Sequence, residues 1–188
     1  MRYSYRTDRL VLRIIEPNQT DAKHILDFHM RNDDVFQKYE PTHSEEFLTL
    51  DHQMKLLDAE LNAATRLSLI RFWVFLRSDP DTVIGTTSFR NISMNFERSC
   101  KIGYKLDKDY WHMGYMTEAV YRAIGIMFDE VELHRIVATI MPENAPSIAL
   151  AKRLGFKFEG VERSSYMVNG AWEDHERWAL ISPFDEED

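Results

Sequence analysis

Residues 105–119 read Lys-Leu-Asp-Lys-Asp-Tyr-Trp-His-Met-Gly-Tyr-Met-Thr-Glu-Ala, and they join a predicted strand to a predicted helix through one glycine, Gly114. The first turn of a helix has backbone N–H groups without partners inside the helix, and the helix dipole is positive there. Together these features attract phosphate, so the stretch predicts a phosphate-binding turn. An ordinary strand-to-helix connection has the same local features, so the choice between the two depends on the surrounding chain.

The chain around this turn has the pattern of a sheet with one parallel pair of strands. Runs of apolar and β-branched residues predict four strands before the turn, at residues 9–15, 67–76, 83–89 and 100–106. After the turn, an apolar stripe that includes Val120, Ala123 and Met127 predicts a helix packed on a core, and residues 134–141 return to a strand pattern. This order is a βαβ crossover, which makes the two flanking strands parallel.

The remaining segments are predicted as helices and a final hairpin. Thr42 and Glu45 have capping-box spacing before an apolar helical pattern. Pro146 suits the first turn of another, shorter helix. Asn169-Gly170 is typical of a two-residue hairpin turn, and residues 172–181 follow it as the closing strand.

Length and composition fit one compact domain. With 188 residues and 44% hydrophobic content, the chain can bury about 70% of the surface that its unfolded form exposes. We expect a single domain over residues 1–188, in which residues 185–188 form a solvated acidic tail. No apolar run reaches the roughly 18 residues of a membrane helix, and the opening segment has no signal-like apolar core. We therefore expect a cytoplasmic protein without membrane contact, which the single cysteine, Cys100, also fits.

The charge balance argues against nucleic acid as a partner. The formal net charge is −8 and the pI is about 5.4, whereas nucleic-acid binding depends on clustered Lys and Arg. Basic substrates suit an acidic protein better, although solubility alone explains the same balance. The histidines lack ligand spacing such as His-x-x-x-His beside a carboxylate, so no metal site is predicted.

Several motifs follow one another along nearly the whole chain. They are Thr7-Asp8-Arg9-Leu10-Val11-Leu12-Arg13, Ile102-Gly103-Tyr104-Lys105-Leu106, Tyr110 to Ala119, Asn144-Ala145-Pro146-Ser147, Arg153-Leu154-Gly155-Phe156 and Glu159-Gly160. In this order and spacing, the chain resembles the GCN5-related N-acetyltransferases (GNAT superfamily), and among them the RimJ/RimL-type ribosomal-protein N-terminal acetyltransferases. The resemblance implies an α/β (α+β) fold with a mixed, mostly antiparallel twisted sheet. About seven strands are expected, flanked by about four helices, with one parallel βαβ crossover at the cofactor site.

The resemblance also implies that the turn binds acetyl-CoA as a co-substrate. Backbone amides would hold the pyrophosphate, and the pantetheine arm would lie between splayed strands. The implied cofactor-binding residues are Tyr104, Leu106, Trp111, His112, Met113, Gly114, Tyr115, Met116, Thr117, Asn144 and Arg153. The family turn usually reads Tyr-Trp-Gly-Lys-Gly-Tyr-Ala-Thr-Glu-Ala, so His112 replaces a glycine and Met116 an alanine. Because backbone amides bind the phosphate, these changes leave the site in place if the turn geometry survives.

Acetyl transfer requires a neutral amine, a polarised carbonyl and a proton for the leaving thiolate. By resemblance to the RimL-type enzymes, Ser147 donates that proton and Asn144 fixes the loop and the cofactor, although both residues also fit ordinary helix capping. Many relatives use a tyrosine at the position of Ala151, and some carry a glutamate at that of Thr139. No general base is assigned. A water relay remains an option, as do the side chains of Glu97, Glu143, Asp174 and His175.

The sequence thus predicts an acetyl-CoA-dependent N-acetyltransferase that acts by direct transfer in a ternary complex. The resemblance implies a protein N-terminal α-amine, such as that of a ribosomal protein, as the acceptor. An acetyltransferase for a small-molecule amine (an amino acid, polyamine or aminoglycoside) is the nearest alternative, because residues 20–61, which build the acceptor cleft, vary most in this fold. A non-catalytic acyl-CoA sensor is the alternative of another class. Homodimer formation through the helices or the final hairpin stays open.

Overall fold

The computed structural model describes residues 1–41 and 43–183, so the acidic tail at 185–188 lies outside the described residues. The strands are β1 (Ser4–Arg6), β2 (Leu10–Arg13), β3 (Leu69–Leu76), β4 (Asp79–Ser93), β5 (Ser99–Leu106), β6 (Arg135–Ile140), β7 (Lys157–Val168) and β8 (Ala171–Ile181). The α-helices are α1 (Gln19–Phe36), α2 (Leu50–Thr65), α3 (Tyr115–Asp129) and α4 (Ala145–Arg153), and two short 3₁₀ turns are η1 (Glu45–Leu48) and η2 (Lys108–Tyr110). None of these described helices is long and apolar enough to cross a membrane.

The strands form one sheet in the order β1-β2-β3-β4-β5-β6-β8-β7. Among the described strands only β5 and β6 pair in parallel, and α3 connects them, as the βαβ pattern predicted. The predicted fold is therefore confirmed, with eight described strands where about seven were expected. The additional strand is β1, which has three residues and buries only Tyr5, so its sequence carries almost no strand pattern.

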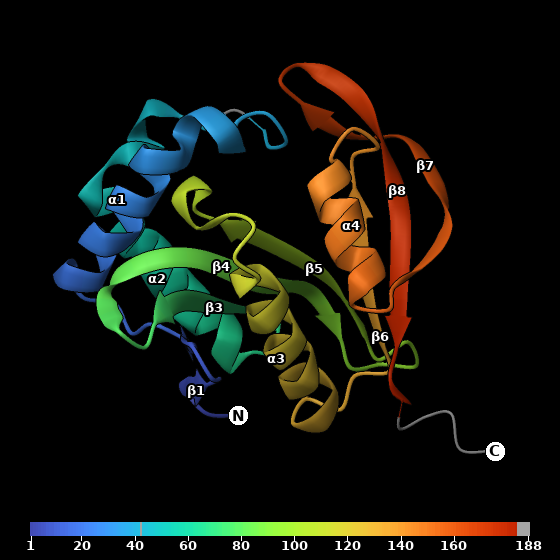
Figure 1. Ribbon diagram of the computed structural model, residues 1–188, viewed down its shortest axis with the longest axis horizontal. Helices are drawn as coiled ribbons and strands as arrows, with labels where there is room; N and C mark the ends of the chain where they lie inside the picture. The colour runs from blue at the N-terminus through green and yellow to red at the C-terminus, as the bar shows by residue number, and fades with distance from the viewer. Residues whose placement is uncertain (42, 184–188) are drawn as a thin grey trace.

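Pairing between β5 and β6 stops before either strand ends. The parallel register runs from Ser99 opposite Arg135 to Ile102 opposite Ala138. Residues 103–106 of β5 and 139–140 of β6 continue as strand without pairing to each other, and we call this unpaired stretch the fork. Figure 1 shows the two strands diverging, with α3 and α4 in front of them.

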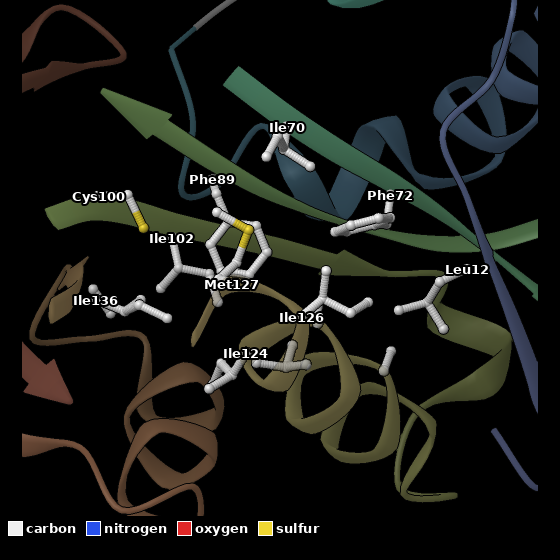
Figure 2. Packing of buried hydrophobic residues seen from close by; sticks show 14 of the residues in the cluster. Leu12, Ile70, Phe72, Phe89, Cys100, Ile102, Ile124, Ile126, Met127 and Ile136 are labelled. Carbon is white, nitrogen blue, oxygen red and sulfur yellow. The ribbon is translucent and has the colours of Figure 1, made fainter. Parts of the chain in front are cut away.

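Helices cover the two faces of the sheet unequally. On one face, α3 and α4 pack on a large apolar core. Figure 2 shows part of this core, where side chains of the strands (Leu12, Ile70, Phe72, Phe89, Ile102) meet those of α3 (Ile124, Ile126, Met127). On the other face, α1 and α2 enclose a smaller core around Phe28, Leu57 and Trp73. Neither core includes a residue of β7, which forms one edge of the sheet.

The second long helix begins later than its capping-box pattern indicated. Thr42 lies outside the described residues, and Glu45 belongs to the 3₁₀ turn η1. The helix starts at Leu50, because the Thr49 hydroxyl accepts a hydrogen bond from the His52 amide and caps it there. The side chain of Gln53 then donates to the Phe47 carbonyl at 2.6 Å, which ties η1 to the helix.

The buried His29 side chain should make the stability of the protein depend on pH. Burial lowers its pKa from 6.5 to about 3, and the charges of Lys105 and Arg71 add to this effect. Between these pH values the unfolded chain binds one more proton than the folded chain, so stability falls as the pH is lowered. We expect urea unfolding to show wild type losing about 2 kcal/mol more than His29→Leu between pH 7 and pH 5.

The matched control for this experiment is His112→Asn, which changes an exposed histidine in a conformation that asparagine tolerates. It should keep the wild-type pH dependence. Equal losses in wild type and His29→Leu would show that His29 is not the group responsible.

Candidate active site

The turn between β5 and α3 has the backbone geometry of an anion site. His112 and Gly114 are both left-handed, with φ of 62° and 79°. For His112 this conformation costs about 1 kcal/mol relative to glycine. Gly114 occupies the N-cap position and offers no side-chain cap, so the amides of the first turn of α3 have no partner within the helix. This is the arrangement that binds phosphate.

The segment before β2 holds this turn in place. Arg9 donates from its guanidinium to the Met113 carbonyl at 2.9 Å, and its Nε lies 2.6 Å from a carboxylate oxygen of Glu118. Glu118 also accepts from the Arg9 amide and the Thr7 hydroxyl. Burial raises the pKa of Glu118, but these donors outweigh it and lower the pKa overall. Glu118 is therefore an ionised brace rather than a proton-transfer group.

Side chains at the turn mostly point away from a ligand on the amides. Met116 is buried in the main core, and its terminal methyl packs against Gly85. The Tyr115 ring lies under the Arg9 guanidinium, 4.4 Å from its centroid. His112 and Met113 are exposed. At Tyr115 and Met116 the side chain is therefore engaged within the protein, and the backbone is the part that could meet a ligand.

The backbone of Tyr104 and Leu106 faces the fork. The Asp107 amide donates to Ile84 of β4, and alternate residues of a strand direct their backbone groups to opposite edges. Tyr104 and Leu106 therefore direct theirs toward β6, where pairing has ended. The indole of Trp111 donates to the Leu106 carbonyl at 2.9 Å, which leaves the other groups available to an extended ligand.

Asn144 and Ser147 lie together at the start of α4. The Asn144 side-chain oxygen accepts from the Ser147 amide at 3.2 Å, so Asn144 does cap the helix. Its NH₂ group and the Ser147 hydroxyl have no partner among residues 1–41 and 43–183, and both residues are half-buried. The Tyr104 phenol donates to the Ser147 carbonyl at 3.1 Å and thereby joins β5 to α4. Capping thus leaves both polar groups free to act on a ligand.

Arg153 reaches the turn from the far end of α4. Its guanidinium donates to the Thr117 hydroxyl at 3.2 Å, which brings two predicted cofactor-binding residues together across 36 positions. Arg153 is exposed, and it adds positive charge beside the free amides of α3. The neighbouring Lys152 instead lies over the Trp178 ring.

The proposed general bases are poorly placed. Glu97 is exposed in the loop before β5, at the opposite end of that strand from the turn. Asp174 accepts from Arg163 and from the Ser164 amide, and these donors lower its pKa. Glu143 is exposed, and His175 is buried against the Tyr166 ring. Within the part of the chain that the structure describes, no cluster of three or more His, Cys, Asp or Glu could hold a metal ion.

Sequence reasoning missed the brace made by Thr7 and Arg9. Both residues belong to the first motif that carries the family resemblance, but the pattern gives no sign of their partner. Their contacts to Glu118 span 111 and 109 positions, and only the folded sheet brings them together.

Comparisons with known proteins agree with this geometry. Residues 9–157 match the family model described as an acetyltransferase (GNAT) domain. The probable N-acetyltransferase YjcK of Bacillus subtilis (strain 168) is 34% identical over 168 residues, covering 89% of this chain and 92% of that protein. The [ribosomal protein uS5]-alanine N-acetyltransferase of Escherichia coli (strain K12) is 31% identical, covering 94% and 90%. The crystal structure of ribosomal-protein-S5-alanine acetyltransferase from Vibrio fischeri aligns with a TM-score of 0.90 at 31% identity, covering 98% and 99%.

The Glu118 brace can be tested by removing its charge. Glu118→Gln keeps the shape but places an amide NH₂ among N–H donors, so we expect unfolding to require about 1–3 kcal/mol less free energy. Loss of the brace also loosens the turn that Arg9 holds, so the dissociation constant for acetyl-CoA should rise in calorimetry. Glu16→Gln is the matched control, because Glu16 is exposed and lies outside both the brace and the turn. Unchanged stability and affinity in Glu118→Gln would contradict the role given to this residue.

Proposed function

The chain belongs to the acetyltransferase (GNAT) domain family, and on that premise we propose that its acceptor is the N-terminal α-amine of a protein. Membership makes it an acetyl-CoA-dependent N-acetyltransferase. The acceptor is supported by one observation above all, a nearly full-length likeness at 31% identity to two enzymes named for an alanine of a ribosomal protein. This likeness includes α1 and α2, and α1 contacts the residues that lead into the turn, where its Asn32 side chain accepts from the Lys108 amide at 2.8 Å.

The residues at the fork and the turn suit acetyl-CoA. Free first-turn amides and Arg153 offer positive charge for its phosphates. The unpaired backbone of Tyr104 and Leu106 suits an amide-containing arm that binds as an additional strand. When bound, acetyl-CoA supplies an activated acetyl group as a thioester.

Ser147 is the proton donor of this proposal. Its free hydroxyl lies on the α4 side of the fork, and Asn144 holds its backbone in the first turn of the helix. Tyr104 is unsuited to this task, because its proton is already donated to the Ser147 carbonyl. Tyr104 instead keeps α4, and with it Ser147, beside the fork.

The acceptor is tested with matched pairs of peptides. A peptide with a free N-terminus and the same peptide with a formylated N-terminus, both containing one lysine, are incubated with enzyme and acetyl-CoA. We expect thiol release and a mass gain of one acetyl group only with the free N-terminus. Acetylation of the lysine, or activity confined to polyamines, amino acids or aminoglycosides, would contradict the α-amine proposal. Tight acetyl-CoA binding without turnover on any amine would support a sensor instead.

Ser147→Ala tests the proton donor. Loss of a positioned acid typically lowers turnover by about 10²–10⁴-fold. We expect kcat to fall within this range in a thiol-release assay, while calorimetry shows an acetyl-CoA dissociation constant within a few-fold of wild type. The control is Ser78→Ala in the exposed turn between β3 and β4, which should leave kcat unchanged. A Ser147→Ala enzyme with wild-type kcat would remove this assignment.

A further inference from the structure

Tyr166 of β7 contacts the fork from the face opposite α4. Its phenol oxygen accepts a hydrogen bond from Lys101 Nζ at 2.9 Å, across 65 positions of sequence. Lys101 lies between Cys100 and Ile102, which are buried in the core under α3, so its side chain projects from the other face of the sheet. Thr139 lies likewise between two core residues, and its side chain is the second hydrogen-bonding neighbour of Tyr166.

These two neighbours place the phenol at the point where β5 and β6 separate. Lys101 belongs to the last positions of β5 that pair with β6, and Thr139 is the first residue of β6 beyond that pairing. A side chain that contacts both lies over the base of the fork. Tyr166 itself is half-buried.

The β7–β8 hairpin holds Tyr166 in this position. Asn169 and Gly170 are both left-handed, which gives the tight turn that their sequence predicted. The Asn169 side chain donates to the Gln37 carbonyl at 2.8 Å, next to the end of α1. Figure 1 shows this hairpin reaching toward the end of α1, above the diverging strands. The Tyr166 ring also packs on His175, with their centroids 4.6 Å apart.

The surroundings lower the pKa of the Tyr166 phenol. Burial raises the pKa of Tyr166 and is the largest single effect. Hydrogen bonds from Lys101 and Thr139, together with the Lys101 charge, outweigh it and lower the pKa overall. The titratable or charged groups facing Tyr166 are Lys101 from β5, Glu162 from β7, and Glu173 and His175 from β8. Among the charges that shift the Tyr166 pKa, that of Glu162 raises it. Arg177 forms an ion pair with Glu162 at 2.9 Å.

We propose that Tyr166 is the general base of acetyl transfer, which takes a proton from the acceptor ammonium at the fork; this rests on the proposed function. The phenolate accepts one proton, and the neutral amine then forms a C–N bond with the acetyl carbon. The C–S bond breaks, and the sulfur leaves with the proton of the Ser147 hydroxyl. The nitrogen, which still carries two protons, gives one of them through water to the Ser147 oxygen and becomes the amide. Tyr166 releases its proton to solvent. The balance is one ammonium and one thioester converted to one amide, one thiol and one proton.

Tyr166→Phe removes the base and keeps the ring. We expect kcat to fall by about 10²-fold or more. In wild type, kcat/KM should rise with pH along a limb set by Tyr166, and this limb should be absent in Tyr166→Phe. Lys101→Met should shift the limb to higher pH, because it removes the donor and charge that lower the tyrosine pKa. Tyr121→Phe, at an exposed position of α3, is the control and should match wild type.

A second measurement needs no turnover. Ultraviolet difference titration of tyrosinate should show one tyrosine that ionises at lower pH than the others, and Tyr166→Phe should remove that transition. Acetyl-CoA affinity equal to wild type would show that the variant is folded. A merely structural Tyr166 would leave the pH limb in place, and that result would overturn the proposal.

Different results would contradict the proposed acetyltransferase function and the proposed role of Tyr166. If wild type acetylates no amine, the proposed function fails and the role of Tyr166 in it fails as well. If wild type acetylates a free N-terminus and Tyr166→Phe does so with the same kcat and pH profile, only the assignment of Tyr166 is wrong.

Discussion

The end of backbone pairing between β5 and β6 is the constraint on which the rest of the site depends. Pairing stops after Ala138, so the backbone groups of Tyr104 and Leu106 that face the fork have no neighbouring strand. Partly buried backbone groups require hydrogen-bond partners. The protein supplies one of them, the Trp111 indole, and it fixes α4 beside the fork through the Tyr104 phenol. The remaining groups can bond to water or to an extended ligand, which is why the proposed function places the acetyl-CoA arm at the fork.

The turn between β5 and α3 depends on tertiary contacts in the same way. The left-handed conformation is unfavourable for His112 and close to neutral for Gly114. Arg9 binds the Met113 carbonyl between them, and Glu118 holds Arg9 from the first turn of α3. Arg9 directly precedes β2, against which α3 packs, so this contact forms only when the sheet is complete. The turn therefore acquires its shape from the folded domain, which explains why its local sequence alone fits an ordinary connection equally well.

Sequence patterns predicted the elements that have a clear hydrophobic periodicity or a characteristic turn. The βαβ crossover, the Asn169-Gly170 hairpin and the helix at Pro146 all depend on residues within one element or one turn. The short strand β1 and the start of α2 were not predicted, because the first buries a single side chain and the second depends on a cap at Thr49. The hydrogen bond between Lys101 and Tyr166 had no signal either, since two strands, β6 and β8, lie between β5 and β7 in the sheet.

The fork also explains how groups on opposite faces of a sheet can act on one reaction. Paired strands separate the two faces of a sheet, because their backbone hydrogen bonds leave no space between the strands for a ligand. Ser147 lies on the α4 face, and the Tyr166 phenol contacts Lys101 and Thr139 on the other face. Only where pairing ends can one thioester be reached from both sides. In the proposed mechanism the acid, Ser147, and the base, Tyr166, therefore act from opposite faces. The β7–β8 hairpin, which carries Tyr166, is joined to the end of α1 by the hydrogen bond from Asn169 to the Gln37 carbonyl.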